Sequence, residues 1–394
     1  MPTIHETPRK SEQGETAEHL PRIEATLGGL HIHIWHPQGL RTNDEIASWG
    51  LKTVTGKDMT AEMIKEKTGV RVRSIAKDDE TVQTMAERAV EPLISEIGNR
   101  LISLQFLTSF PNEEERIPGL NHAGSLAAQY GMENLLPNLA GKNGADNRPT
   151  LEANDHHFAC SSGSEVFTHI GNTGRFLGDS WVGIVGSEKY SDKLADPTKG
   201  ETDPAYSYTM FGDASGCMVF RHGKDLTVLA SEPIDFGEDT RNIVRMPIRT
   251  DAICEPAFST PIGSPLLSDI QRANGEIGKF SMEGGALIRK MRRLGKDIDI
   301  FLKKAGIDPK DIALINPHQA SDPVLNHIQA SLTLTLQDKM FRNVETGNYS
   351  GISQMRALAQ AINEGRVKSG DMILFVGFGA GLFASLQLIK LGEK

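Results

Sequence analysis

The sequence has little of what marks secreted, membrane-spanning or disulfide-stabilised proteins. Its 394 residues include only three cysteines, Cys160, Cys217 and Cys254, and no two of them form a C-x-x-C pair. An odd number without such a pair argues against a disulfide framework and against a thiolate zinc site. Residues 1–22 are charged throughout and lack the apolar core of a secretory signal, and no later stretch reaches the roughly 20 apolar residues that a membrane span needs. We therefore expect a cytoplasmic protein that does not enter the membrane.

An excess of positive charge is also absent. The chain carries 42 Lys and Arg against 51 Asp and Glu, which gives a formal net charge of −9. We therefore expect neither nucleic acid nor an anionic membrane among its partners. The length of 394 residues exceeds that of one small domain and indicates two domains or one large unit with two cores.

Runs of strand length alternate with helical segments along the chain. Residues 28–37 alternate apolar and polar side chains, as a half-buried strand does, and residues 101–110 and 181–191 are apolar runs typical of buried strands. Residues 78–97 have apolar side chains at helical spacing, and residues 119–132 are typical of a helix rich in small residues. This alternation predicts an α/β fold with a largely parallel sheet.

The stretch "FACSSGSEVF", residues 158–167, places Cys160 between the end of a short strand and the start of a predicted helix. The partial positive charge at a helix N-terminus favours thiolate over thiol and lowers the pKa of a cysteine. Cys160 is therefore a candidate nucleophile, although the same context also suits a small buried thiol. We predict no metal site with His156 and His157, because adjacent histidines on a strand point to opposite faces.

Three segments far downstream also place polar residues or glycines at the ends of predicted strands. His318 follows the apolar run that ends in "INP", Asn348 lies in the glycine-rich turn "TGNYSG", and the loop Gly377–Gly381 interrupts the apolar residues 371–391. Open α/β folds place their chemistry at the ends of strands. Taken alone, His318 also suits a structural histidine and Asn348 a turn residue.

Together these segments resemble the β-ketoacyl-(acyl carrier protein) synthase III group of the thiolase superfamily. The matching motifs come in the order of that family: "RTNDEI", "KTGVRVRSIA" followed by "DET", "ACSSG" with Cys160, "VGSEKYS", "MFGDASGCMVF", "SMEGG", "NPHQAS" with His318, "GNYSGIS" with Asn348, and "GFGAGL". They run from about residue 25 to the C-terminus.

The resemblance implies a thiolase fold, which consists of two similar βαβαβαββ halves in a five-layer αβαβα arrangement and is usually a homodimer. On this basis residues 1–25 are expected to be a polar N-terminal extension. The N-terminal half would span residues 26–225 and hold the nucleophile Cys160, and the C-terminal half would span residues 226–394 and hold His318 and Asn348.

The resemblance also implies an acyltransferase that uses acyl-CoA and a malonyl thioester, with no cofactor and no metal, and with acyl carrier protein as a further partner. Cys160 would take the acyl group, and the backbone N–H groups of Cys160, Gly379 and Ala380 would hold the oxyanion. His318 and Asn348 would bind the thioester oxygen while the malonyl group loses CO2. The resulting carbanion would attack the acyl group on Cys160 and give a 3-oxoacyl product.

The sequence departs from the family at the expected binding site for CoA and carrier protein. The family has a tryptophan and an arginine that clamp adenine, where this chain has Met63 and Lys67, and Pro323 stands where a basic carrier-docking residue is common. The remaining candidates for CoA or carrier binding are the basic residues Lys67, Arg289, Arg292 and Arg293. A merely solvated basic helix face is the alternative.

Other functions stay open at this point. A hydroxymethylglutaryl-CoA synthase would need a glutamate where this chain has Phe110. A nondecarboxylative Claisen enzyme, or an ester- or amide-forming acyltransferase of secondary metabolism, would keep the acyl-cysteine and change the acceptor. An inactive thiolase-fold partner subunit would not need Cys160, His318 and Asn348, all of which are present. An apparent insertion at residues 241–270 leaves the acyl group undefined.

Overall fold

The computed structural model describes most of the chain. The described residues are 19–53, 55–97, 100–109, 122–130, 152–157, 159–173, 181–191, 206–234, 236, 244–245, 254–255, 281–282 and 284–393. The expected extension up to residue 18, Phe110 and most of the apparent insertion at residues 241–270 therefore lie outside the described residues.

The first sheet has seven described strands. In spatial order they are β1 (Ile23–Leu27), β2 (Leu30–Trp35), β8 (Ala214–Arg221), β7 (Trp181–Glu188), β5 (Leu101–Leu107), β6 (Glu152–His156) and β11 (Cys254–Glu255). The pairs β7–β5 and β5–β6 are parallel, and the other pairs are antiparallel. The expectation of a largely parallel sheet is therefore wrong. One reason is local: Gly28, at φ +62°, and Gly29 form a tight turn inside the segment expected to be one strand, and a two-residue turn returns the chain antiparallel.

The second sheet has the described order β13, β14, β15, β9. Its strands are β13 (Ile312–Pro317), β14 (Met372–Gly379), β15 (Phe383–Leu391) and β9 (Leu226–Ile234). Only β13 and β14 pair in parallel among these four. Strand β9 follows β8 after a short turn, so the chain passes there from the first sheet to the second. Two small ribbons complete the described strands: β3 (Gly39–Thr42) with β4 (Val72–Ile75), and β10 (Val244–Arg245) with β12 (Ser281–Met282).

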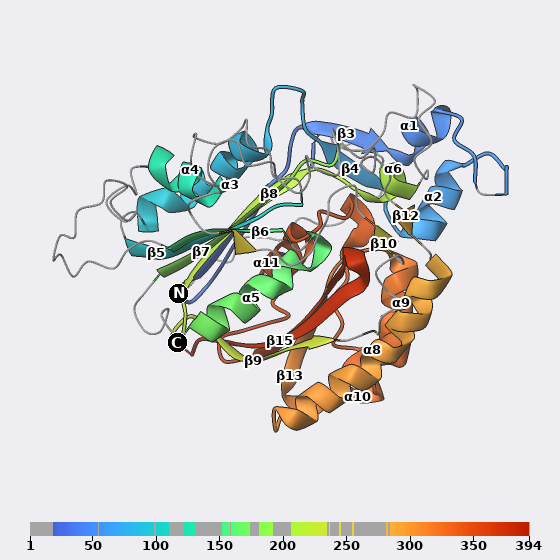
Figure 1. Cartoon of the computed structure of the whole chain (residues 1–394). Helices are drawn as coiled ribbons and strands as arrows, with labels where there is room; N and C mark the ends of the chain where they lie inside the picture. Colours follow the sequence, from blue (N-terminus) through green and yellow to red (C-terminus); the bar gives the residue numbers. More distant parts are fainter. Residues whose placement is uncertain are drawn as a thin grey trace, which may run out of the picture.

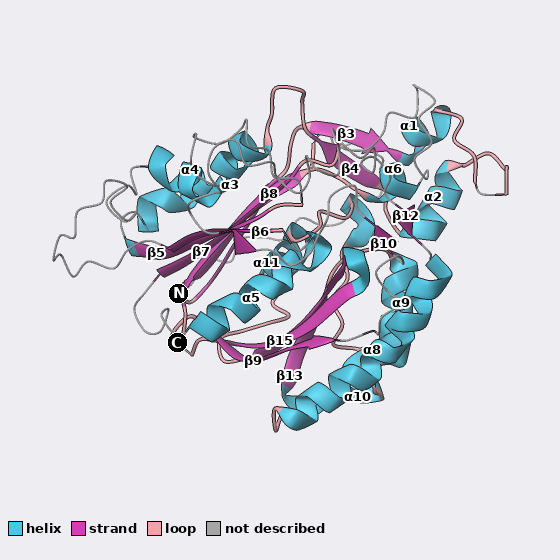
Figure 2. Cartoon of the chain, in the orientation of Figure 1, coloured by secondary structure: helices cyan, strands magenta, loops and turns pink. Residues whose placement is uncertain are grey.

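The described helices and the two sheets form five layers (Figures 1 and 2). Helices α3 (Val82–Ile97) and α4 (His122–Gln129) cover the outer face of the first sheet, and α5 (Ser162–Thr173) and α11 (Ile352–Asn363) lie between the sheets. Helices α8 (Gly284–Lys304), α9 (Asp322–Ser331) and α10 (Leu334–Gln337) lie outside the second sheet. The order αβαβα is the one expected.

Short helices lie at the periphery and at the strand ends. They are α1 (Asn43–Ser48), α2 (Ala61–Thr68), α6 (Tyr206–Met210), and the 3-10 turns η4 (Ala159–Ser161), η7 (Pro309–Asp311), η8 (Val344–Thr346) and η9 (Ala380–Leu382). Of the helices in the described part of the chain, none is both long and apolar enough to cross a membrane.

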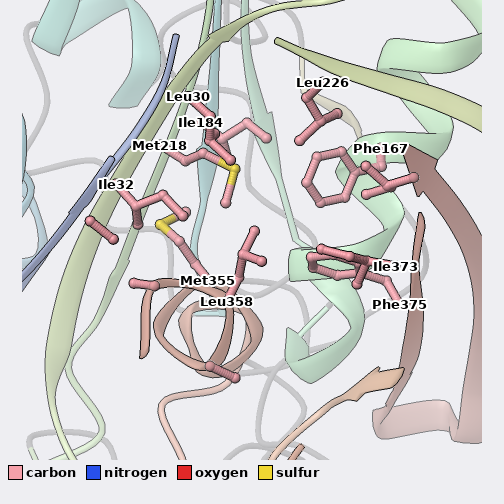
Figure 3. Close-up of a cluster of buried hydrophobic side chains, with 14 of the residues drawn as sticks. Leu30, Ile32, Phe167, Ile184, Met218, Leu226, Met355, Leu358, Ile373 and Phe375 are labelled. Atoms are coloured by element: carbon pink, nitrogen blue, oxygen red, sulfur yellow. The ribbon is translucent and has the colours of Figure 1, made fainter. Parts of the chain in front are cut away.

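A buried apolar cluster fills the space between the two sheets (Figure 3). Phe167 of α5 packs edge-on against Phe375 of β14, with ring centroids 5.1 Å apart. Met355 and Leu358 of α11 face Ile184 of β7 in the same cluster. Each such side chain contributes roughly 1.5–3 kcal/mol when it is fully buried. The cluster therefore fixes α5 and α11 between the sheets, and their N-terminal ends meet beside the candidate site.

Candidate active site

One open pocket of about 490 Å³ brings together the predicted catalytic groups. Its described lining includes Cys160, His318, Asn348, Gly379 and Ala380. The rest of the described wall is mostly apolar: Met210, Phe211, Leu287, Ala320, Ser321, Val324, Phe378 and Leu382. Four segments far apart in the sequence therefore converge on one open pocket.

Cys160 lies in the turn η4, two residues before the first residue of α5. The preceding residue, Ala159, has the left-handed φ of +47°, a conformation that non-glycine residues adopt rarely and at functional sites. Burial raises the pKa of the Cys160 thiol to about 12, although hydrogen bonds with the hydroxyls of Ser350 and Tyr190 act in the opposite direction. This shift is opposite to the one expected from the helix terminus alone, because desolvation of the thiolate outweighs it. The thiol therefore needs a proton acceptor before it can act as a nucleophile at neutral pH.

Glycines let two other backbone segments approach Cys160 closely. A Cβ on Gly379 would lie 3.2 Å from the Cys160 nitrogen and 2.9 Å from the Ser161 nitrogen. A Cβ on Gly163, in the first turn of α5, would lie 2.1 Å from the carbonyl oxygen of Gly351. The backbones of the motifs "GFGAG", "SSGSE" and "SGIS" thus pack closely because their glycines have no side chain. This packing places Gly379 and Ala380 beside Cys160.

Replacing Gly163 with alanine is expected to lower the free energy of unfolding by about 1–3 kcal/mol, the usual cost of overpacking a core. The added methyl group would meet the backbone oxygen of Gly351, which cannot rotate away as a side chain can. Urea denaturation of the wild type and the variant measures this loss. The matched control is Gly284→Ala, because a Cβ there meets nothing within 4 Å and the backbone is not in the left-handed region. Equal stability of Gly163→Ala and the wild type would contradict the close approach.

His318 directly follows β13 and is a neutral side chain in this structure. It is 1% exposed, and burial lowers its pKa to about 3. Its backbone nitrogen donates to the Val376 carbonyl at 2.9 Å, and its ring packs edge-on against Phe378 at 5.2 Å between centroids. A neutral imidazole donates from one ring nitrogen only. The side chain is therefore positioned as a single hydrogen-bond donor without charge.

Asn348 is held through its backbone and through one side of its amide. Its nitrogen donates to the Met210 carbonyl at 2.8 Å, and its carbonyl accepts from Gly212 at 3.2 Å. The side-chain Oδ1 accepts from the Ser350 nitrogen at 2.8 Å. This bonding assigns the orientation of the amide and leaves Nδ2 as the donor for a ligand in the pocket.

A polar network beside Cys160 is not predicted from the sequence. The fully buried Glu188 and the hydroxyl-bearing residues Ser109, Tyr190 and Ser350 form this network through hydrogen bonds. Glu188 and Tyr190 lie in the quoted motif "VGSEKYS", and Ser350 lies in "GNYSGIS". The signal in the sequence that could have pointed to this network is an acidic residue, Glu188, at the end of an apolar strand.

The four basic residues predicted to bind CoA or carrier protein are not in the pocket. Lys67 of α2 lines a separate small cavity with Met63 and Thr209. Arg289, Arg292 and Arg293 are exposed on α8, the helix whose Leu287 lines the catalytic pocket. Their role in binding stays a prediction.

His156 and His157 point to different partners, as the expected strand geometry requires. His156 Nε2 bonds Gln105 Oε1 at 2.6 Å, whereas His157 Nδ1 bonds the Thr108 carbonyl at 3.0 Å. Across the described ranges, no group of three or more His, Cys, Asp or Glu side chains is arranged to hold a metal ion.

Comparison with known proteins agrees with this geometry. Residues 302–391 match the family model for "3-oxoacyl-(acyl-carrier-protein) synthase III C terminal". The mycobacterial β-ketoacyl-(acyl carrier protein) synthase III of Mycolicibacterium paratuberculosis is 25% identical over 370 residues, which cover 93% of this chain and 96% of the relative. The β-ketoacyl-(acyl carrier protein) synthase III of Clostridium perfringens is 29% identical over 336 residues, which cover 80% of this chain and 94% of the relative.

The solved structure of 3-oxoacyl-(acyl-carrier-protein) synthase III from Aquifex aeolicus matches with a TM-score of 0.65 at 23% identity, covering 94% of this chain and 100% of that chain. The five layers and this match define a protein of the thiolase fold, as the sequence predicts. Within that superfamily, sequence and structure together confirm the predicted resemblance to the β-ketoacyl-(acyl carrier protein) synthase III enzymes.

Proposed function

We propose that the protein is an acyltransferase that joins two acyl thioesters by a decarboxylative Claisen condensation. Cys160 takes an acyl group from acyl-CoA or acyl carrier protein, and this group condenses with a malonyl thioester to a 3-oxoacyl product. The observation that carries the proposal is the shared pocket, which Cys160, His318 and Asn348 line together with Gly379 and Ala380. The β-ketoacyl synthases among the relatives support the same chemistry.

The first half of the reaction is acyl transfer to Cys160. Its thiolate attacks the thioester carbonyl, and the coenzyme or carrier leaves as a thiolate. The negative charge that develops on the carbonyl oxygen needs donors that are already in place. The start of α5 and the backbone at Gly379 and Ala380 meet around the sulfur and supply this environment.

The second half is decarboxylation followed by carbon–carbon bond formation. The malonyl carboxylate leaves as CO2, and its electron pair moves onto the thioester as an enolate. His318, with its proton placed on Nε2, and Asn348 Nδ2 donate to the enolate oxygen, where a mostly apolar pocket strengthens both hydrogen bonds. The enolate carbon then attacks the acyl carbonyl, and Cys160 leaves as a thiolate.

We further propose a cytoplasmic homodimer that needs no cofactor and is divided into two similar halves near residue 225. The passage of the chain from β8 in the first sheet to β9 in the second supports this division. Size-exclusion chromatography with light scattering tests the dimer, and a monomer at micromolar concentration would contradict it.

The exposed basic face of α8 is proposed as the docking surface for the acidic carrier protein or for CoA phosphates. In the triple variant Arg289→Ala, Arg292→Ala and Arg293→Ala, KM for a carrier-bound substrate is expected to rise about tenfold and kcat to stay unchanged. Exposed charges at the edge of a binding surface mainly accelerate the association of the two partners. The control is Lys303→Ala, at the other end of the same helix. Unchanged KM for both carrier and CoA substrates would remove the face from substrate binding.

The proposed function is tested by intact-mass spectrometry of the wild-type protein with a panel of acyl-CoA donors. We expect the mass of one acyl group to be added at Cys160, and release of labelled CO2 and of a 3-oxoacyl product when a malonyl thioester follows. An acyl adduct without CO2 release would favour a nondecarboxylative Claisen enzyme or an ester- or amide-forming acyltransferase. No adduct with any donor would favour an inactive partner subunit.

A further inference from the structure

A chain of buried hydroxyl groups connects Cys160 to a carboxyl group that the reaction described above does not use. Glu188, the last residue of β7, is fully buried. Its Oε1 accepts from Ser109 Oγ at 2.8 Å, and its Oε2 accepts from the Ser109 nitrogen at 2.9 Å. Ser109 Oγ lies 3.0 Å from Ser350 Oγ, and the nearby Ser350 hydroxyl acts to lower the pKa of the Cys160 thiol. Two hydroxyl groups, those of Ser350 and Ser109, therefore lie between the sulfur and the carboxylate.

Tyr190 fixes the centre of this path. Its hydroxyl donates to Ser109 Oγ at 3.1 Å, and its ring stacks on Phe211 at 4.2 Å between centroids. Phe211 lines the catalytic pocket. Ser109 thus receives one hydrogen bond from Tyr190 and gives its own proton toward Glu188, which orients the hydroxyl in the direction that a proton relay needs.

The surroundings of Glu188 act on its pKa in opposite directions. Burial raises the pKa of Glu188 to about 8, whereas hydrogen bonds from Ser109 and Ser350 and the nearby His157 favour its charged form. The titratable or charged residues around it are His157 after β6, Cys160 in η4, Lys189 and Tyr190 beside it on the chain, and Asp213 before β8. Lys189 Nζ donates to a backbone carbonyl at 2.9 Å. A buried carboxylate is costly, and such groups mark functional sites more often than stable cores.

We propose that Glu188 accepts the proton of the Cys160 thiol through Ser350 and Ser109, and so generates the nucleophilic thiolate. This inference rests on the proposed function, whose first step needs that thiolate. Because Glu188 acts through other side chains, it is a positioning residue and not one that touches the substrate.

Protons and charge balance along the path. The S–H bond of Cys160 breaks and its proton goes to Ser350 Oγ, the Ser350 proton goes to Ser109 Oγ, and the Ser109 proton goes to Glu188 Oε1. One negative charge moves from the carboxylate to sulfur, so the site never holds two. This matters because a charged Glu188 raises the pKa of Cys160. The proton returns along the same path when condensation releases Cys160 as a thiolate.

The test is the pH dependence of Cys160 alkylation by iodoacetamide, followed by intact mass between about pH 6 and 10. In the wild type the rate is expected to rise with pH and to level off above about 8, where Glu188 is charged. In Glu188→Gln the rate near pH 8 is expected to fall about a hundredfold, because loss of the general base outweighs the lower pKa of Cys160 that follows from removing the nearby negative charge. The variant should then show a steady rise to the highest pH without an inflection near 8. The matched control, Glu165→Gln, changes another buried carboxyl with a raised pKa, which bonds Gln387, and should keep the wild-type profile.

Two results would overturn the proposal. One is a Glu188→Gln profile that keeps the inflection near pH 8, and the other is an equal loss of rate at every pH, which a merely structural role would produce. If Glu188→Gln does not fold, Ser109→Ala interrupts the same path with Glu188 in place, and an inflection retained there counts against the relay. Alkylation needs no acyl donor, so failure of acyl-CoA to label the wild type would contradict the proposed function and leave this readout intact.

Discussion

Cys160→Ala is expected to carry no acyl group after incubation with acyl-CoA and to lose condensation by at least about 10⁴-fold, a loss typical of a removed nucleophile. The physical reason is that no other described side chain in the pocket offers a nucleophile beside the start of α5 and the Gly379 backbone. The substitution removes a single sulfur atom, and Cys160 is 8% exposed beside the pocket, so the protein should keep its fold. Intact mass measures the adduct, and a coupled assay for free CoA measures turnover.

Cys217→Ala is the matched control for this change. Cys217 is the other described free cysteine, and burial raises its pKa to about 12 as it does for Cys160. It lies on β8 against α3, away from the catalytic pocket. Acylation of Cys217→Ala should equal that of the wild type. An adduct that persists in Cys160→Ala and disappears in Cys217→Ala would identify Cys217 as the nucleophile and contradict the proposed site.

The order of the layers and the candidate residues Cys160, His318 and Asn348 could be predicted from the family resemblance that the motifs carry. Cys160, His318 and Asn348 each follow a strand or a turn that the sequence marks with apolar residues and glycines. The direction of strand pairing could not be read in this way, because the Gly28–Gly29 turn was hidden inside an alternating segment. The geometry of that turn makes the pairing of β1 with β2 antiparallel.

The protonation chemistry of the site depends on contacts that no local pattern reveals. Ser109 meets Glu188 across 79 positions and Ser350 across 241 positions of sequence. The helix terminus beside Cys160 predicts a lowered pKa, whereas burial raises it. A sequence shows which residue types are present near a strand end, but the balance between desolvation and hydrogen bonding exists only once distant segments have packed together.

Asn348→Ala is expected to separate the two halves of the reaction. Release of CO2 from a malonyl thioester should fall by about 10²–10³-fold, the cost of one lost donor to a developing oxyanion, while acylation of Cys160 stays within a fewfold of the wild type. The amide is fixed by the bond from the Ser350 nitrogen to its Oδ1, so the substitution removes the oriented Nδ2 donor together with this one hydrogen bond. Single-turnover intact mass and labelled CO2 measure the two halves separately.

Asn343→Ala provides the control on the same segment, because Asn343 precedes η8 and its amide donates to Gln360 and not into the pocket. His318→Ala should reproduce the split shown by Asn348→Ala. Because burial lowers the pKa of His318 to about 3, its imidazole stays neutral above that pH, and CO2 release should show no inflection near 6.5 from this residue. If Asn348→Ala and His318→Ala lost acylation as severely as decarboxylation, both residues would serve the first half of the reaction, and the enolate would have to be held by other groups.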